Sequence, residues 1–326
     1  MENEELFESR VDLSEVKSTF EAIQVEISKV VLGQEKIVEQ LCIALLCEGH
    51  VLIEGLPGVA KTLTAKCLAK TVDAGFSRIQ FTPDLMPSDV VGTMIYNPKS
   101  SEFSFKSGPI FSNVVLIDEI NRSPAKTQAA LFECMEERQV TVDGISHPLD
   151  SPFMVIGTQN PVDHEGTYRL PEAQLDRFMF KLNVEYPTLE NEQKILELHQ
   201  NIGHRLDLVD IQKVIDNKKL KSIQDTISKV KVKPEILSYI SSIIHETRNN
   251  PNIYLGASPR ASLSLLQSAK TLAATLGRDF VIPDDVKEMI IPVINHRIAL
   301  NPEKEMEGMT NQTALKFIID KVAVPS

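Results

Sequence analysis

The sequence contains no tryptophan, and only four of its 326 residues are cysteine. None of the cysteines has Cys-x-x-Cys spacing, so we interpret Cys42, Cys47, Cys67 and Cys134 as buried thiols in a reducing compartment. The seven histidines form no His-Glu-x-x-His pair, so this signature of a zinc protease is missing. No apolar run approaches the roughly 18 residues that a membrane-spanning helix needs.

Positively charged residues are also fewer than negatively charged ones. The chain has 34 Lys and Arg against 45 Asp and Glu, which gives a formal net charge of -11. This balance argues against a general nucleic-acid or membrane surface. Residues 1–5 are acidic, whereas a signal peptide begins with basic residues, so we expect a cytoplasmic protein. The length allows a large core and two domains.

A phosphate-binding loop is the clearest motif. An apolar run, 51–54, precedes it, and residues 63–70 follow it with strong helix formers at helical spacing. Between them the chain reads Gly55-Leu56-Pro57-Gly58-Val59-Ala60-Lys61-Thr62. A strand, a glycine-bearing loop and a Lys-Thr pair that opens a helix form the layout of a P-loop. This predicts that backbone N–H groups and the helix dipole bind phosphate.

Within this loop, two side chains have predicted roles. Lys61 would contact the β- and γ-phosphates, and the Thr62 hydroxyl would bind Mg²⁺. Ala60 departs from the P-loop pattern, which has glycine at that position. Because alanine tolerates positive φ poorly, we expect either a negative φ at Ala60 or a slightly altered loop. Taken alone, the octapeptide is also compatible with an ordinary strand-to-helix turn.

A second motif supports the nucleotide site. The apolar residues 114–117 predict a strand buried on both faces, as in a parallel sheet covered by helices. Asp118 and Glu119 follow at the carboxyl edge, where α/β proteins bind ligands. Asp118 would support Mg²⁺ through its water shell, and Glu119 would orient the attacking water. By itself, an Asp-Glu pair after a strand can also be a solvated or helix-capping pair.

Further along, two polar residues are candidates for the same edge. Asn160 follows the apolar strand predicted at 153–158, and an amide there can contact the γ-phosphate or the attacking water. It can equally be a turn-forming Asn before Pro161. Arg177 closes a short helix expected after Pro171, and a local salt bridge to Asp176 or Glu172 is its alternative role.

The sequence predicts two domains, an α/β core over 1–187 and a separate helical domain over 188–326. Within the core, Pro and Gly interrupt residues 82–112. This stretch is either a surface loop or a functional insert that contains a hairpin. An Asp143-Gly144 turn predicts a second hairpin within 138–149. Beyond Pro187 the periodicity is helical, and Pro234, Pro259 and Pro283 are placed to begin helices. Lys213 to Lys233 is interpreted as a solvated face.

Together these motifs make the chain resemble the MoxR family of AAA+ ATPases over about residues 31 to 300. The family has a P-loop core with a parallel sheet between helices, followed by a smaller helical lid. Ala at the position of Ala60 is familiar in it. The resemblance rests on the P-loop and on five further segments: Phe81-Thr82-Pro83-Asp84, Gly108-Pro109-Ile110-Phe111, Asp118-Glu119-Ile120-Asn121-Arg122, Gly157-Thr158-Gln159-Asn160-Pro161 and Leu170 to Phe178.

The resemblance implies roles for individual residues. Asn160 is similar to sensor 1, Arg177 to the arginine finger that acts on a neighbouring subunit's nucleotide, and Arg260 to sensor 2. Gly33 and Gln34 are similar to the segment near adenine. With the P-loop, the implied nucleotide-binding set is Gly33, Gln34, Gly55, Pro57, Gly58, Val59, Ala60, Lys61, Thr62 and Leu63.

The family also implies an activity and partners. These are Mg²⁺-dependent ATP hydrolysis, a homo-oligomeric ring that is usually hexameric, and chaperone-like work on proteins, including partners with von Willebrand factor A domains. A chelatase-like or nucleic-acid motor is the alternative, although the low Lys and Arg content disfavours nucleic acid. A low-turnover, ATP-dependent binding switch is a second alternative function. A metabolite kinase fits less well because no second substrate pocket can be identified from the sequence.

Overall fold

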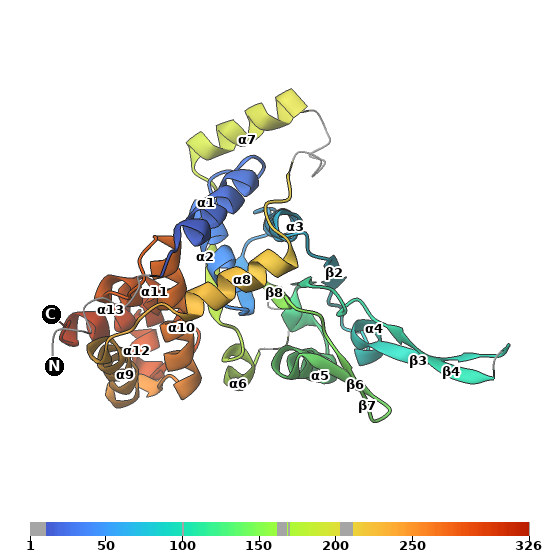
Figure 1. Ribbon diagram of the computed structural model, residues 1–326. Coiled ribbons are helices and arrows are strands. Elements are labelled where there is room, and N and C mark those ends of the chain that lie inside the picture. Colours follow the sequence, from blue (N-terminus) through green and yellow to red (C-terminus); the bar gives the residue numbers. More distant parts are fainter. Residues whose placement is uncertain (1–10, 100, 162–167, 169, 203–210, 326) are drawn as a thin grey trace, which may run out of the picture. The chain divides into compact units, whose positions relative to one another are not determined.

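The computed structural model describes residues 11–99, 101–161, 168, 170–202 and 211–325 (Figure 1). The chain forms two compact units. One is continuous, Ile23–Asn217, and we call it the core unit. The other joins Met1–Ala22 to Lys218–Ser326, and we call it the lid unit.

A five-stranded sheet lies at the centre of the core unit, and all of its strands are parallel. Every residue of strand β5 (Val114–Asp118) is buried, as expected for a sheet covered on both faces. This confirms the αβα fold. In spatial order the strands are β2 (Phe76–Gln80), β5 (Val114–Asp118), β8 (Met154–Gln159), β1 (Val51–Gly55) and β9 (Phe180–Val184).

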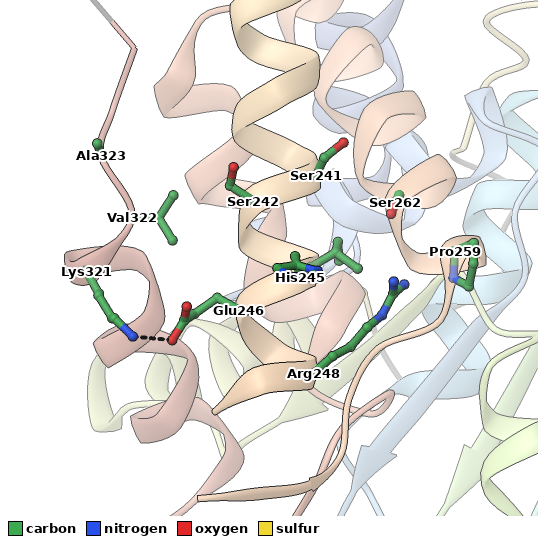
Figure 2. Close-up of a pocket in the computed structure, with 11 residues that line it drawn as sticks. Ser241, Ser242, His245, Glu246, Arg248, Pro259, Ser262, Lys321, Val322 and Ala323 are labelled. Carbon is green, nitrogen blue, oxygen red and sulfur yellow. Dashed lines mark hydrogen bonds and ion pairs between the residues drawn. The ribbon is translucent and has the colours of Figure 1, made fainter. Parts of the chain in front are cut away.

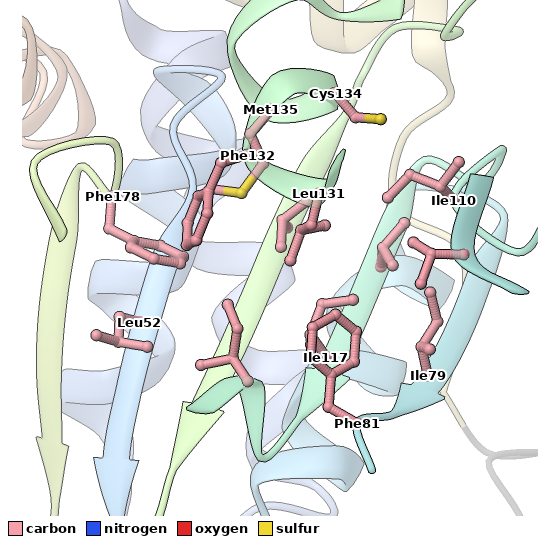
Figure 3. Packing of buried hydrophobic residues seen from close by; sticks show 14 of the residues in the cluster. Leu52, Ile79, Phe81, Ile110, Ile117, Leu131, Phe132, Cys134, Met135 and Phe178 are labelled. Atoms are coloured by element: carbon pink, nitrogen blue, oxygen red, sulfur yellow. The ribbon is translucent and has the colours of Figure 1, made fainter. Parts of the chain in front are cut away.

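Helices cover the two faces of the sheet. Helix α5 (Ala125–Glu137) packs Leu131 and Phe132 against strand residues such as Ile117 (Figure 3). Because side chains alternate along a strand, the neighbours of Ile117 point to the opposite face. There α2 (Glu35–Leu46) contacts β9, and α3 (Lys61–Thr71) contacts β5. This packing fixes the carboxyl edge on which the polar residues lie.

Two hairpins interrupt the αβα order. Within the expected insert, α4 (Pro87–Val91) leads into β3 (Gly92–Asn97) and β4 (Glu102–Ser107), a hairpin that extends away from the sheet (Figure 1). The second hairpin pairs β6 (Gln139–Val142) with β7 (Ile145–Pro148). Asp143 and Gly144, which predict its turn, have φ of 51° and 79°, as a two-residue turn of this kind requires.

Short elements complete the core unit, and helices dominate the lid unit. A 3-10 helix (Ile120–Arg122), α6 (Glu172–Leu175) and α7 (Leu189–Ile202) belong to the core unit. Helix α1 (Ser14–Ser28) runs from one unit into the other. The lid unit contains α8 (Asn217–Ser228), α9 (Pro234–Asn249), β10 (Ile253–Leu255), α10 (Pro259–Thr275), α11 (Pro283–Ile294), β11 (Ala299–Leu300), α12 (Pro302–Met306) and α13 (Asn311–Lys321).

The units divide between residues 217 and 218, thirty residues after the expected boundary at 187. Backbone hydrogen bonds account for the longer core unit. The N–H groups of Val214 and Ile215 donate to the Thr71 carbonyl over 2.7 and 3.2 Å, and Lys213 pairs with Asp73 at 2.7 Å. Residues 213–215 are therefore attached to the end of α3. None of the helices in the described chain has the length and hydropathy required to cross a membrane.

Candidate active site

The loop between β1 and α3 has P-loop geometry. It leaves the sheet at Gly55, and Lys61 is the first residue of α3. Gly58 has a φ of 85°, and a Cβ built on it would meet nothing within 4 Å, so the backbone there is open to a ligand. Because helix α3 begins directly after the loop, the free N–H groups of its first turn lie at the loop.

Ala60 adopts the left-handed conformation, with φ 58° and ψ 19°. Of the two alternatives expected for this residue, a negative φ is therefore wrong. The structure keeps the backbone conformation natural to glycine and accepts strain of about 1–2 kcal/mol for an L-residue. The Ala60 carbonyl nevertheless begins α3, because it accepts hydrogen bonds from the Thr64 N–H and hydroxyl, both at 3.0 Å.

Lys61 lies within electrostatic reach of the acidic pair. Burial lowers the pKa of its ammonium, while Asp118 and Glu119 act in the opposite direction. The Nζ atom donates to the Gly55 carbonyl over 2.6 Å, so the side chain folds back across the loop. A partly desolvated cation beside two carboxylates is suited to bind a polyanion that brings its own metal ion.

Asp118 is held at the end of β5 from two sides. Arg78 on β2 donates its Nε to Oδ2 at 2.5 Å, and the Thr158 hydroxyl on β8 donates to Oδ1 at 3.2 Å. Both partners come from strands adjacent to β5. The carboxylate therefore has a fixed orientation at the carboxyl edge of the sheet.

Glu119 is positioned by its backbone and by two donors. Its φ of 57° turns the chain out of the strand, and its N–H donates to the Thr158 hydroxyl at 3.0 Å. The carboxylate oxygen Oε2 accepts from Gln80 at 2.9 Å and from Arg122 at 2.8 Å. Arg78, Gln80, Arg122 and Thr158 were not predicted to be site residues, although Arg122 and Thr158 lie in two of the segments that carry the family resemblance. Gln80 and Thr158 lie near the carboxyl ends of strands that border β5, Arg78 lies in the middle of β2, and Arg122 ends the 3-10 helix. Their closeness to the acidic pair can be recognised only once the strand order is known.

Asn160 lies next to both halves of the site. It directly follows β8, which pairs with β5 on one side and with β1 on the other. The carboxyl ends of β5, β8 and β1 lie side by side, so Asn160 lies between the P-loop and the acidic pair. This is the location predicted for an amide that contacts phosphate or water. Most of the nearby stretch 162–169 lies outside the described residues.

Arg177 pairs with a residue that the sequence did not suggest. Its guanidinium lies 2.6 Å from the Glu136 carboxylate at the end of α5, and its Nη1 donates to the Ala173 carbonyl at 2.9 Å. This ion pair joins Arg177 to the end of α5, a partner distant in sequence from the local ones expected. The side chain is 28% exposed, so the guanidinium remains accessible at the surface of the core unit.

Gly33 and Gln34 approach the P-loop from the start of α2. The Gln34 side-chain amide donates to the Val59 carbonyl over 2.7 Å. Gly33 has a φ of 73°, and a Cβ there would collide with the side chain of Asn191 on α7. This positive φ and close contact require glycine. The contact to Val59 joins the segment to the loop, and its place near adenine stays a prediction.

Arg260 belongs to the lid unit. It lies in the first turn of α10, where its N–H donates to the Ser258 hydroxyl at 3.2 Å, and its side chain is exposed. The other candidate residues all belong to the core unit. The assignment of Arg260 as sensor 2 therefore remains a prediction.

The donor set at the sheet edge fits a magnesium nucleotide. The Thr62 hydroxyl and the Asp118 carboxylate are hard oxygen ligands of the kind that Mg²⁺ prefers. Among the described residues no group of three or more His, Cys, Asp or Glu side chains is arranged to hold a metal. Mg²⁺ commonly uses one or two carboxylates and keeps water and phosphate as its other ligands, so a sparse protein donor set is appropriate.

Comparison with known proteins agrees with this geometry. The model for the ATPase family associated with various cellular activities (AAA) matches residues 50–180, in the core unit, and the AAA lid domain model matches 245–317, in the lid unit. The chain is 45% identical over 299 residues to the uncharacterised protein YeaC of Bacillus subtilis (strain 168), with 92% of each chain covered.

Two further matches are also nearly full-length. Chaperone MoxR1 of Mycobacterium tuberculosis (strain ATCC 25618 / H37Rv) is 41% identical over 318 residues, covering 94% of this chain and 82% of that protein. A crystal structure of a candidate ATPase from Cytophaga hutchinsonii ATCC 33406 superposes with a TM-score of 0.89 at 42% identity, covering 96% of this chain and 97% of that one. With the AAA and lid models, these relatives show that the chain belongs to the MoxR family of AAA+ ATPases.

Proposed function

We propose that this protein binds ATP with Mg²⁺ at the carboxyl edge of its sheet, hydrolyses it between ring subunits, and uses the turnover to remodel or activate protein partners. The observation that carries the proposal is the position of the P-loop and the acidic pair at one edge of the sheet. Strands β1 and β5 both pair in parallel with β8, so Lys61 after β1 and the Asp118-Glu119 pair after β5 come from motifs some sixty residues apart and lie at the same carboxyl edge. The effect of both carboxylates on the pKa of the Lys61 ammonium agrees with this placement.

Each residue has a separate task in this proposal. Lys61 and the N–H groups of the loop bind phosphate oxygens, and Thr62 with Asp118 orients the metal. Glu119 accepts a hydrogen bond from the attacking water and draws its proton away from oxygen. Bound MgATP would supply the γ-phosphoryl group and the metal charge that neutralises it. Gln80 and Arg122 hold the Glu119 carboxylate in place for this task.

The proposal predicts separate losses at Glu119 and Lys61. Glu119→Gln keeps the size and the hydrogen-bonding ends of the side chain but removes its basicity, so we expect at least about a hundredfold lower kcat with ATP affinity nearly unchanged. Lys61→Ala removes the phosphate contact, so we expect weaker ATP binding. Steady-state phosphate release and titration with a fluorescent ATP analogue measure the two quantities.

A matched control is Glu133→Gln, which makes the same chemical change at an exposed position of α5. It should leave both kcat and ATP affinity near the parent values. Normal turnover by Glu119→Gln would refute the assignment of this carboxylate to the water. An unchanged ATP titration with Lys61→Ala would refute the phosphate-binding role of Lys61.

Ring assembly is the second part of the proposal. Arg177 lies at the surface of the core unit, and Glu136 orients its guanidinium, as suits an arginine offered to a neighbouring subunit. Arg260 would reach the γ-phosphate from the lid unit. We propose a homo-oligomer, hexameric as is usual in the family, with von Willebrand factor A domain proteins among its partners.

Two alternatives have discriminating tests. A chelatase-like or nucleic-acid motor would change its ATPase rate on addition of the appropriate ligand, and single- and double-stranded DNA are the first to test. A low-turnover switch would associate tightly with its partner in ATP but show no multiple turnover. The remodelling proposal expects multiple turnover and no stimulation by DNA, in keeping with the net charge of -11.

A further inference from the structure

A hollow in the lid unit is lined by residues that the nucleotide site described above does not use. It has a volume of about 810 Å³ and is bounded by α9, the start of α10 and the end of α13 (Figure 2). We call it the α9 hollow. Its size falls within the range of about 300–1,000 Å³ that is typical of ligand pockets. All of its lining residues belong to one compact unit, so its geometry does not depend on the core unit.

Arg248 lines this hollow as an exposed residue whose stem is fixed by the neighbouring loop. Its Nε donates to the Ala257 carbonyl at 2.8 Å, and a Cβ on Gly256 would lie only 2.7 Å from the Arg248 Cα and Cγ. Glycine at 256 therefore allows the arginine stem to pack tightly against the loop before α10. Figure 2 shows the guanidinium pointing between α9 and Pro259. Within the described chain its two Nη atoms have no hydrogen-bond or ion-pair partner.

The rest of the lining supplies donors. Ser241, His245 and Arg248 follow one another at spacings of four and three and so share one face of α9. Ser262 lines the hollow from α10. The hydroxyls of Ser241 and Ser262 make no hydrogen bond with the part of the chain that the structure describes. Ser241, His245 and Arg248 are exposed, and Ser262 is half-buried, so the lining offers solvent-accessible hydrogen-bond donors to a ligand.

The charge balance of the hollow is positive. Glu246 is the single carboxylate among its lining residues, and Lys321 neutralises it at 2.5 Å. Arg248 therefore leaves one uncompensated positive charge in a chain whose net charge is -11. Because a guanidinium presents paired N–H donors, it matches the two oxygens of a carboxylate or phosphate.

We propose that the α9 hollow is a binding site for an oxyanion group, held by the Nη atoms of Arg248 and by the neighbouring serine hydroxyls. The group is either a free phosphate or the side-chain carboxylate of an acidic peptide segment, since both offer the same paired oxygens. The proposal is independent of ATP hydrolysis.

The absence of tryptophan provides a local readout. Leu263, next to Ser262, is 66% exposed, so Leu263→Trp introduces a single indole beside the hollow in the full-length chain. At low ionic strength, we expect saturable fluorescence changes with inorganic phosphate or with a Glu-rich peptide. Saturation by phosphate alone identifies a small anion, and saturation by the peptide identifies a protein segment. A linear response to both would overturn the proposal.

Variants separate this site from the P-loop. Arg248→Gln should weaken binding at least about tenfold, because it removes a charged, two-point contact. Ser262→Glu should block binding by placing a carboxylate in the hollow, and it keeps the test decisive if Arg248→Gln is unstable. Lys233→Gln removes an exposed charge at the other end of α9 and should have no effect. The signal must also survive Lys61→Ala, since phosphate bound at the P-loop is not the species proposed.

Discussion

At the scale of single residues, Ala60 is where the P-loop departs most from ordinary backbone geometry. Its φ of 58° is a conformation that glycine adopts freely and that alanine tolerates at a cost. The cost is small enough for a methyl group to be accepted. Branching at Cβ would raise the conformational energy further, because β-branched residues are genuine outliers at positive φ.

We therefore expect opposite results from two substitutions at this position. Ala60→Gly should keep ATP-analogue affinity within about threefold, because the loop conformation remains accessible. Ala60→Val should weaken affinity at least about tenfold, because the loop must change to relieve the strain. Titration with a fluorescent ATP analogue measures both. Equal affinity of the Val variant and the parent would show that the loop does not need this conformation to bind nucleotide.

At the scale of secondary-structure elements, His50 joins three parts of the core unit just before β1. Its Nδ1 accepts the Val155 N–H of β8 at 3.0 Å, so the proton resides on Nε2, which donates to the Met135 carbonyl of α5 at 3.0 Å. Burial lowers the pKa of this imidazole to about 4, and Arg138 adds to the decrease. Protonation would remove the acceptor on Nδ1.

This arrangement predicts a loss of stability in mild acid. The folded-state pKa lies below the unfolded value of about 6.5, so the unfolded chain takes up the proton first. The stabilisation that the neutral imidazole provides above pH 6.5 is lost as the pH falls toward 4. By pH 5 the free energy of unfolding has decreased by about 2 kcal/mol. Urea unfolding at pH 7.5 and pH 5 measures the loss.

His50→Gln should lose this component of the pH dependence, although it lowers stability at both pH values. His199→Gln, at an exposed position on α7, should keep the parent's pH dependence. If the His50→Gln variant and the parent lost the same stability between the two pH values, the imidazole would not be the group responsible.

Local patterns predicted the elements that carry the site. The P-loop, the buried β5 strand and the Asp-Gly turn each lie within a few residues, and short-range chemistry determines them. Helix α8 was missed because the lysines around it indicated a solvated face. Its buried residues, Leu220, Ile223 and Ile227, have the spacing of an amphipathic helix. That apolar stripe was the available signal.

At the scale of the whole molecule, long-range pairing lay beyond the sequence. The ion pairs Arg78–Asp118 and Arg177–Glu136 join residues about forty positions apart. They form because β2 lies next to β5 and because α6 is near the end of α5. One sequence does not reveal which strand borders which, so the residues that orient the acidic pair emerged only with the strand order.

Assembly should control the rate of ATP hydrolysis. If Arg177 acts on the nucleotide of a neighbouring subunit, its absence from a lone subunit costs about 10³–10⁵ in rate. Specific ATPase activity should therefore rise with protein concentration, in parallel with the assembled fraction measured by analytical ultracentrifugation. Arg177→Ala should abolish the rise while nucleotide binding is kept.

Lys126→Ala serves as the control for this experiment, since it removes an exposed cation from α5 that is separate from the Glu136 pair. It should show the parent's concentration dependence. Specific activity that stays flat while the protein assembles would exclude catalysis by a neighbour's arginine.

The attachment of residues 213–215 to α3 has a mechanical consequence. A helix of eleven residues is about 16 Å long, and here one end carries Lys61 while the other, at Thr71, holds the chain that leads out of the core unit. A shift of α3 along its axis would therefore carry residues 213–215 with it, because the hydrogen bonds of Val214 and Ile215 tie them to the last residue of the helix.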